Sequence, residues 1–335
     1  FSGAGSGTKD DPYRIFNADQ LNQVRNFAGD DNVYFSLEAD IDMTQWIEEN
    51  NPTQGWQPIG STGYDSFEGH FNGNGHIISN LTINRPETDN IGLFGRIYGK
   101  AEISGIVLMD ANYIGNENIG GIIGYVQGGN ISSCSFYGNL KGNKNIGGIA
   151  GETSSPYASG DMYIGYDDYS VEIRECYSYA NISGQNICGG IVGFTEENYH
   201  DEGNITINNS YSAGIINGNE CVGGIIGRTE IDYSISNNGK DLITKCYANS
   251  QKLNGKLNIG GIIGGADIQS AGSSFISKNF SINNTISSEN GIFRVGYKLE
   301  ELNNYGWVLT NLILNDEVLP TPEDSPENGI NIGLS

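Results

Sequence analysis

The sequence is poor in the basic and long apolar segments on which binding to nucleic acids and membranes depends. Lys and Arg together number 17 against 40 Asp and Glu residues, so the formal net charge is −23 over 335 residues. Because duplex binding relies on basic side chains that neutralise phosphates, this balance argues against a nucleic-acid-binding protein, and no local basic patch is visible. No apolar run of about 18 residues occurs, so we expect no membrane-spanning helix.

Residues typical of catalytic and metal sites are also scarce. The chain has three His residues, His70, His76 and His200, and it lacks HExxH, GxSxG and Walker-type motifs. A zinc peptidase would therefore lack its metal site, and the sequence predicts neither a metal nor a cofactor. The five Cys residues form no CxxC pair and no even framework, so no disulfide scaffold is expected. They are Cys134, Cys176, Cys188, Cys221 and Cys246.

Glycine is abundant, at 49 residues, and many of these glycines belong to an internal repeat. The copies are NIGGIIG at 118–124, NIGGIAG at 145–151, NICGGIVG at 186–193, CVGGIIG at 221–227 and NIGGIIG at 258–264, with IGLFG at 91–95. A second motif, Ile-x-x-Cys in its commonest form, alternates with the first. Such a repeat indicates stacked units, none of which buries its apolar side alone. We expect the glycines at tight corners, where φ is positive and backbones approach closely.

The residues that follow the second motif alternate with period two, which is typical of strands with one buried face. The inward positions are Cys134, Cys176, Ser210 and Cys246. The outward positions, Tyr177, Tyr211, Tyr247 and Phe280, predict a row of stacked rings. Parallel coils about 4.8 Å apart would join the inward residues into one core, and right-handed crossovers are the default. The sequence therefore predicts an all-β, right-handed parallel β-helix.

The two ends of the chain differ from the middle, as the caps of a solenoid must, because an open coil exposes its core and its strand edge. We predict strands at 13–16 and 33–43, a helix at 17–27 that begins at Asn17, a second helix at 297–307, a strand at 308–315 and a polar segment at 321–328. These elements predict an N-terminal cap with the first coils at 1–90, a repeat β-helix at 91–296 and a C-terminal cap and tail at 297–335.

Three segments together resemble the GLUG-motif repeat proteins. They are the GG(I/V)(I/V/A)G motif, the Ile-x-x-Cys-Tyr strand and GWQPIG...FEGHFNGNGHIISNLTI at 55–83. The resemblance covers roughly residues 5–296 and implies a bacterial cell-surface β-helix of a family that includes IgA-peptidase-like segments. It brings no catalytic motif with it. The chain starts at Phe1 without an initiator Met, which we interpret as a mature chain whose export signal has been removed.

Unequal coil lengths point to one corner as the candidate site. The segments between a glycine motif and the next Ile motif are short at 96–102 and 125–130 but long at 152–172, 194–206 and 228–242. Because equivalent corners align in a solenoid, these insertions are expected to form one patch, where Tyr rings and carboxylates recognise a ligand. The candidate ligand-binding residues are Tyr157, Tyr163, Tyr166, Asp167, Asp168, Tyr169, Glu196, Glu197, Tyr199, Asp201, Glu202 and Tyr233.

These features leave more than one function open. The first is a secreted or cell-surface monomer that acts in adhesion or binds a glycan or protein ligand without catalysis. The alternative is a polysaccharide lyase or glycosidase in which Asp167, Asp168, Glu196 and Glu197 act as acid and base or hold Ca²⁺. The acidic loops are also explained by solubility alone, since charged edges oppose aggregation. The sequence names neither the ligand nor the mode of anchoring.

Overall fold

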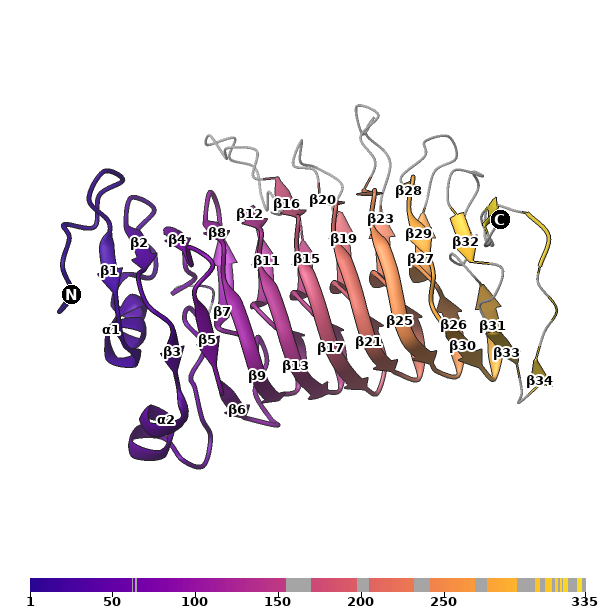
Figure 1. Ribbon diagram of the computed structural model, residues 1–335, viewed down its shortest axis with the longest axis horizontal. Helices are drawn as coiled ribbons and strands as arrows, with labels where there is room; N and C mark the ends of the chain where they lie inside the picture. The colour runs from indigo at the N-terminus through magenta and orange to yellow at the C-terminus, as the bar shows by residue number, and fades with distance from the viewer. Residues whose placement is uncertain are drawn as a thin grey trace, which may run out of the picture.

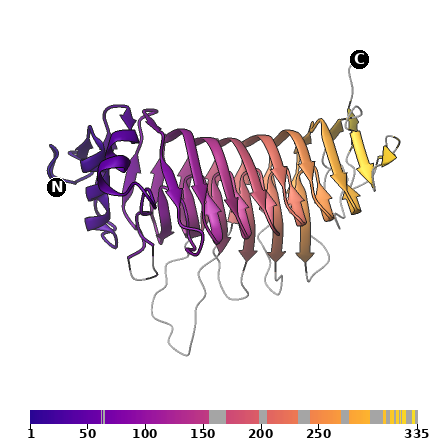
Figure 2. The ribbon, with the colours of Figure 1, turned by 90° about the horizontal axis from the view of Figure 1, so that it is seen from below.

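The chain winds into a rod of stacked parallel coils. The structure is a computed structural model and describes residues 1–61, 63, 65–154, 170–197, 205–231, 242–268, 276–293, 305–307, 311–314, 317–318, 320, 322–324 and 330–332. The coils follow one another from β1 (Tyr13–Ile15) at one end of the rod to β35 (Ile330–Ile332) at the other (Figure 1, Figure 2). The predicted parallel β-helix is confirmed.

Four sheets, here called A to D, run along the rod. Sheet A continues from β1 with β2 (Tyr34–Leu37), β4 (His70–Asn72), β8 (Glu102–Ser104), β12 (Gly129–Ser132), β16 (Val171–Arg174), β20 (Ile205–Asn208), β24 (Ile243–Thr244) and β28 (Ile276–Ser277). Sheet C holds β7 (Phe94–Tyr98), β11 (Ile123–Gln127), β15 (Ala150–Ser154), β19 (Val192–Glu197), β23 (Ile226–Ile231) and β27 (Ile263–Ile268). Sheet D holds β10 (Glu117–Gly120), β14 (Lys144–Gly147), β18 (Cys188–Gly189), β22 (Glu220–Gly223), β26 (Leu257–Gly260) and β31 (Asn290–Phe293).

Sheet B is the largest, with 14 strands. It holds β3 (Ile41–Asp42), β5 (Ile77–Ser79), β6 (Thr82–Asn84), β9 (Val107–Ile114), β13 (Ser135–Gly142), β17 (Tyr177–Gly184), β21 (Tyr211–Asn217), β25 (Tyr247–Asn254), β29 (Phe280–Ser281), β30 (Thr285–Ser288), β32 (Tyr305–Trp307), β33 (Asn311–Leu314), β34 (Glu317–Val318) and β35. One turn of the rod visits the sheets in the order A, B, D, C, as in β12, β13, β14 and β15. The β33–β34 pair is antiparallel, whereas every strand pair described in sheets A, C and D is parallel.

The interior is one continuous apolar core that extends from Ile15 to Ile286. Cys134, Cys176, Ser210 and Cys246 are each 0% exposed. The period-two prediction of inward positions is therefore confirmed for this ladder. Burial along the whole rod explains why single coils need their neighbours, because each coil covers the apolar side of the next.

The glycine motif forms the corner between sheets D and C, and one part of its prediction is wrong. The motif glycines do not have positive φ; the left-handed positions at this corner belong to Asn90, Asn118, Asn145, Cys221 and Asn258. Asn tolerates this region because its short side chain bonds locally. The predicted close approach is confirmed, since a Cβ on Gly124 or Gly151 would collide with the backbone of Asn90 or Asn118.

The N-terminal cap contains the predicted helix in a shorter form. Helix α1 (Ala18–Gln23) begins after Asn17, whose Oδ1 accepts a hydrogen bond from the Gln20 backbone N–H at 3.0 Å. The helix then tightens into the 3₁₀ turn η1 (Val24–Phe27), which keeps Val24 buried. A second helix, α2 (Thr44–Asn50), was not predicted. None of the helices in the described part of the chain has the length and apolarity that crossing a membrane requires.

The strand predictions near the ends are partly right. The predicted strand at 33–43 is split into β2 and β3, and the predicted strand at 308–315 contains β33. The predicted helix at 297–307 is wrong for its last three residues, which form β32, while 297–304 lie outside the described residues. Stacking on β29 explains this difference, because a paired strand satisfies backbone groups that a short isolated helix would leave open.

Candidate functional site

The predicted loop corner lies where the chain passes from sheet C to sheet A. The insertion after β15 starts beside the one after β19, since Ser154 pairs with Glu196, and Val171 pairs with Ile205 where the chain re-enters sheet A. Glu196 and Glu197 belong to β19, and the side chain of Glu197 is not described. The other candidates lie outside the described residues: Tyr157, Tyr163, Tyr166, Asp167, Asp168, Tyr169, Tyr199, Asp201, Glu202 and Tyr233. The ligand site at this corner therefore stays a prediction.

The outer surface of sheet C borders this corner and is called here the carboxylate face. It includes Arg96, Tyr125, Glu152, Phe194, Glu196, Arg228, Glu230 and Asp267. The alternate residues Thr153, Thr195 and Thr229 are buried, so the face residues point outward. Glu196, Glu230 and Asp267 occupy one register position on three consecutive strands. The structure therefore aligns three carboxylates beside the predicted loop corner.

Glu152 is a partly buried carboxyl group of this face. Burial raises the pKa of Glu152, and the negative charge of Glu196 raises it further, whereas the hydrogen bond from Asn145 Nδ2 to Glu152 Oε2 at 2.8 Å opposes both. The Arg96 guanidinium lies 4.5 Å from the ring centre of Tyr125 on the neighbouring strand. The sequence prediction missed Glu152, which directly follows Gly151, the last glycine of the motif copy at 145–151.

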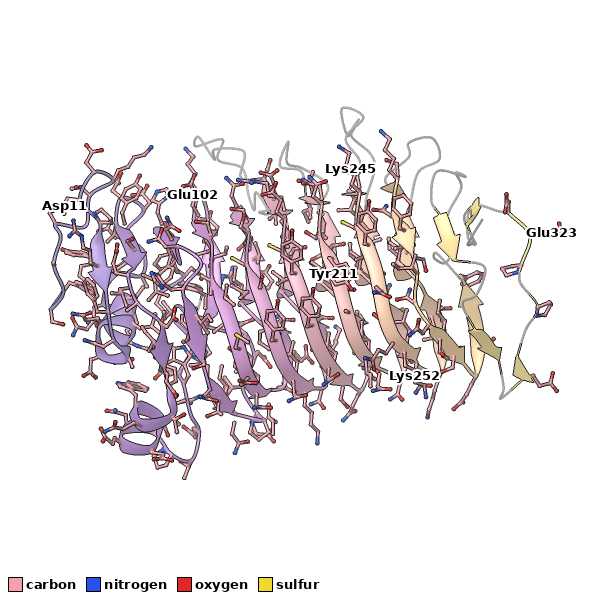
Figure 3. The ribbon with its side chains drawn as sticks, in the orientation of Figure 1. Asp11, Glu102, Tyr211, Lys245, Lys252 and Glu323 are labelled. Carbon is pink, nitrogen blue, oxygen red and sulfur yellow. The ribbon has the colours of Figure 1, made fainter. Side chains whose placement is uncertain are left out.

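The outer surface of sheet B has a different chemistry and is called here the tyrosine face. It consists of Tyr137, Tyr177, Tyr179, Tyr211, Tyr247 and Phe280. Tyr177, Tyr179 and Tyr247 are 43%, 40% and 44% exposed. Tyr211, the first residue of β21, lies about midway along the rod (Figure 3). The face therefore presents large, accessible aromatic area.

The rings of the tyrosine face follow two rows. The predicted row is in register, and its rings Tyr247 and Phe280 stack at 4.8 Å with an angle of 3° between their planes. A second row was missed: Tyr137 and Tyr179 stack at 4.6 Å and 5°, and Tyr179 approaches Tyr211 at 5.6 Å. Following the period-two pattern two residues further along each strand would have found it.

Amides continue the tyrosine face toward sheet D. Asn139 Nδ2 donates to Asn112 Oδ1 at 2.6 Å, and Asn181 Nδ2 donates to Asn139 Oδ1 at 3.2 Å. Strands β13, β17, β21 and β25 contain no Asp or Glu, and their charged residues are Lys141 and Lys252. On a protein with a net charge of −23, these four strands form a broad surface without carboxylates, although the exposed Asp110 lies on the adjoining β9.

The described His residues pair with carboxylates of neighbouring coils. His70 Nδ1 lies 3.0 Å from Glu102 Oε2 and its ring stacks on Tyr34 at 4.1 Å, while His76 Nδ1 lies 3.1 Å from Asp40 Oδ1. The candidate His200 lies outside the described residues. Within the described part of the chain, no group of three or more His, Cys, Asp or Glu residues could hold a metal ion.

The five Cys residues are buried thiols without disulfide bonds. Burial raises the pKa of Cys188 and of Cys246 to about 12. Because the thiolate is the reactive form, burial and the raised pKa favour a packing role for these two thiols.

Comparison with known proteins supports the fold and leaves the activity open. No protein-family model matches the chain. It is 39% identical over 126 residues to an Evansella cellulosilytica protein that carries the provisional name Gly-rich membrane protein, covering 38% of this chain and 14% of that protein. It is 32% identical over 124 residues to Halomucin of Haloquadratum walsbyi, covering 37% of this chain and 1% of that protein. The chain thus spans a small part of both relatives.

A solved structure shares the architecture along nearly the whole rod. A Bacteroides ovatus protein, provisionally named an immunoglobulin A1 protease, superposes with a TM-score of 0.61 and 22% identity. The match covers 98% of this chain and 86% of that chain. At this identity the likeness shows a common fold, and it transfers no activity.

Proposed function

We propose that this chain belongs to an exported, cell-surface β-helix protein of the GLUG kind that binds a glycan or protein ligand without turning it over. The observation that carries the proposal is the tyrosine face, with rings 40% to 44% exposed on strands that contain no Asp or Glu. The name of the Evansella relative, a membrane protein, supports a location at the cell envelope.

The chemistry of the tyrosine face suits a glycan. Tyr offers flat apolar area and a hydroxyl at a low cost in side-chain entropy, which suits the C–H faces and hydroxyl groups of sugars. The amide ladder of Asn112, Asn139 and Asn181 adds both donors and acceptors beside the rings. A flat sheet with these groups at strand spacing can contact several units of a polymer at once.

The missing carboxylates support binding as well. A partner that covers a carboxylate must remove its hydration, which is costly unless a compensating charge is supplied. The tyrosine face avoids this penalty, although the chain carries 40 acidic residues. The surface is therefore better prepared for contact than the acidic surfaces of the same rod.

A glycan and protein array probed with the purified chain tests the proposal. The variant Tyr177→Ala/Tyr179→Ala/Tyr247→Ala is expected to lose at least about tenfold in affinity for any ligand found, because aromatic contacts contribute about 1 kcal/mol each. Phe16→Ala is the matched control, since Phe16 is 50% exposed but belongs to the N-terminal cap. Unchanged binding by the triple variant, or turnover of the bound ligand, contradicts the proposal.

A second candidate function, a polysaccharide lyase or glycosidase, is favoured by Glu152. A carboxyl group with a raised pKa can donate a proton to a leaving oxygen while a neighbouring carboxylate such as Glu196 acts as base. This function requires release of reducing ends from a polysaccharide by the purified chain. It also requires that Glu152→Gln and Glu196→Gln each abolish that release while the tyrosine face is intact.

A further inference from the structure

A groove of about 720 Å³ lies at the corner between sheets B and D and is called here the lysine groove. Its lining includes Lys252, Lys256, Asn219, Asn254, Ser287 and Glu289. Two ammonium groups face one carboxylate, so the groove has a positive balance in a protein whose net charge is −23. This contrast sets the groove apart from the acidic surface around it.

Both lysines are held on rigid backbone and are exposed. The Lys256 backbone N–H donates to Asn219 O at 2.8 Å, and its carbonyl accepts the Asn290 N–H at 2.7 Å and the Ser288 hydroxyl at 3.0 Å. Lys252 pairs with Ile215 in sheet B. Neither lysine forms an ion pair with any residue that the structure describes, so both charges are available to a ligand.

Uncharged hydrogen-bonding groups connect the lysine groove to a further lysine. Lys141, Ser183, Asn217, Asn254 and Ser287 occupy one register position on five consecutive coils. Within this row Ser287 Oγ donates to Asn254 Oδ1 at 2.6 Å. At the strand spacing, Lys141 lies roughly 14 Å from Asn254 along the rod. Positive charges thus stand near both ends of a row of hydroxyls and amides that borders the tyrosine face.

We propose that the lysine groove and this row bind the carboxylate or sulfate groups of an acidic polysaccharide, whose sugar rings lie against the tyrosine face. The inference rests on the proposed glycan-binding function and specifies its ligand class. A polyanion is repelled by most of this acidic molecule, whereas ammonium groups form charge-assisted hydrogen bonds with its anionic groups. Glu289 in the groove and Glu220 beside Asn219 are the nearby carboxylates, and they limit the affinity.

Titration calorimetry of the full chain with polygalacturonate, dextran sulfate and uncharged dextran tests this inference. Lys252→Gln/Lys256→Gln is expected to weaken binding of the two polyanions about tenfold, since two exposed ion contacts together account for about one order of magnitude. Added salt should weaken wild-type binding and change the variant less. Glu289→Gln should strengthen binding, because it removes a like charge from the groove.

Lys245→Gln/Lys278→Gln is the matched control. Like the groove variant, it removes two positive charges, but from exposed lysines outside the groove whose backbone is in the left-handed region. Lys245 lies at the opposite edge of sheet B from Lys252 (Figure 3). Retained binding in this control, together with loss in the groove variant, supports the inference. Unchanged binding by the groove variant, equal loss in the control, or equal competition by duplex DNA overturns it. If uncharged dextran alone binds through the tyrosine face, the inference fails and the proposed function survives; if the array finds no ligand at all, both fail.

Discussion

The tyrosine face and the carboxylate face differ in chemistry although the same coils build both. Strands β13, β17, β21 and β25 of sheet B present aromatic rings and amides without a carboxylate, whereas sheet C aligns Glu196, Glu230 and Asp267 on consecutive strands. The inward residues of both sheets are constrained by stacking, since each contacts the coils on either side. The repeat therefore constrains the side chains inside the rod, whereas the outward side chains differ from one sheet to the next.

The two faces also differ in what stacking contributes to stability. Identical neighbours stabilise the tyrosine face, because rings stack and amides donate to one another at strand spacing. Identical neighbours destabilise the carboxylate face, because like charges on adjacent strands repel. Arg228 offsets part of this repulsion, with its Nη2 2.5 Å from Glu230 and 3.9 Å from Asp267. The row of Glu196, Glu230 and Asp267 therefore lowers the stability of the fold, and a surface with a purely structural role would not need it.

The largest effect is expected from a substitution that removes the shared framework of both faces. A Cβ in Gly147→Ala would collide with the Ala150 carbonyl and lie 2.5 Å from the Gly193 backbone N in the next coil. We expect a loss of about 3 kcal/mol or more in the free energy of unfolding, measured by urea denaturation. Gly75→Ala, which meets nothing within 4 Å but has a φ of +77°, should cost about 1 kcal/mol. Equal losses in both variants would contradict the close-packing explanation.

The next largest loss of stability is expected when neighbouring carboxylates, like those of the carboxylate face, are placed on the tyrosine face. Asn139→Asp/Asn181→Asp replaces neighbouring amides with like charges and should cost about 2 kcal/mol near pH 7. Repulsion raises the folded-state pKa of the new carboxyl groups above the unfolded value. The loss in the free energy of unfolding is therefore complete above the folded-state pKa. It disappears as the pH falls below the pKa of Asp in the unfolded chain, which is about 3.9.

Urea denaturation at several pH values measures this change. Asn26→Asp, at an exposed position in η1, is the control and should show no such recovery on acidification. If the double variant were as stable as wild type near neutral pH, the amide hydrogen bonds between neighbouring coils would not contribute to the difference in stability between the two faces.

A smaller effect is expected at Glu152. Burial raises its pKa in the folded state, so the group favours folding at low pH, and this contribution is lost as the pH rises through the folded-state pKa. Glu152→Gln keeps an oxygen that can accept a hydrogen bond from Asn145, and it should flatten the decline in Tm as the pH rises above the unfolded-state pKa of about 4.3. Glu87→Gln, which removes an exposed carboxylate elsewhere on the rod, is the control. An unchanged pH profile in Glu152→Gln would show that burial does not perturb this group.

The smallest effect is expected from Arg228→Gln. Its side chain is 35% exposed and that of Glu230 is 40% exposed, so solvent and salt screen their attraction. We expect a loss of about 0.5 kcal/mol in low salt and less in high salt. A loss well above about 1 kcal/mol would mean that the carboxylate row depends on this one cation.

The sequence allowed the interior and one outer row to be predicted because period two and a repeat together define the register. Cys134, Cys176, Ser210 and Cys246 are buried as predicted, and Tyr177 pairs with Tyr211. Side-chain pairs between neighbouring coils could not be predicted as well as the inward and outward positions, because the number of residues in a coil varies. His70 and Glu102 are 32 residues apart, whereas Asn139 and Asn181 are 42 apart.

The corner geometry and the site were harder to predict. Gly can adopt positive φ more easily than other residues. At the corner between sheets D and C, however, Gly151 is needed because the backbone of Asn118 leaves no room for a Cβ. The residue with positive φ there is Asn118 itself. Sequence alone does not separate these two reasons for a glycine. The perturbation of Glu152 also depends on burial by neighbouring strands, which becomes visible only when the coils are stacked.

The orientation of the coils has a mechanical consequence. Strands β1 and β35 lie at opposite ends of the rod (Figure 1), and hydrogen bonds between neighbouring coils point along its axis. A pull on the two ends therefore loads all coil boundaries in series, and the rod opens stepwise as the weakest boundary separates first. Coils of 27 and 42 residues would release roughly 90 Å and 140 Å of extended chain. Stretched between two anchoring points, the protein would lengthen in unequal steps and limit the tension that it transmits.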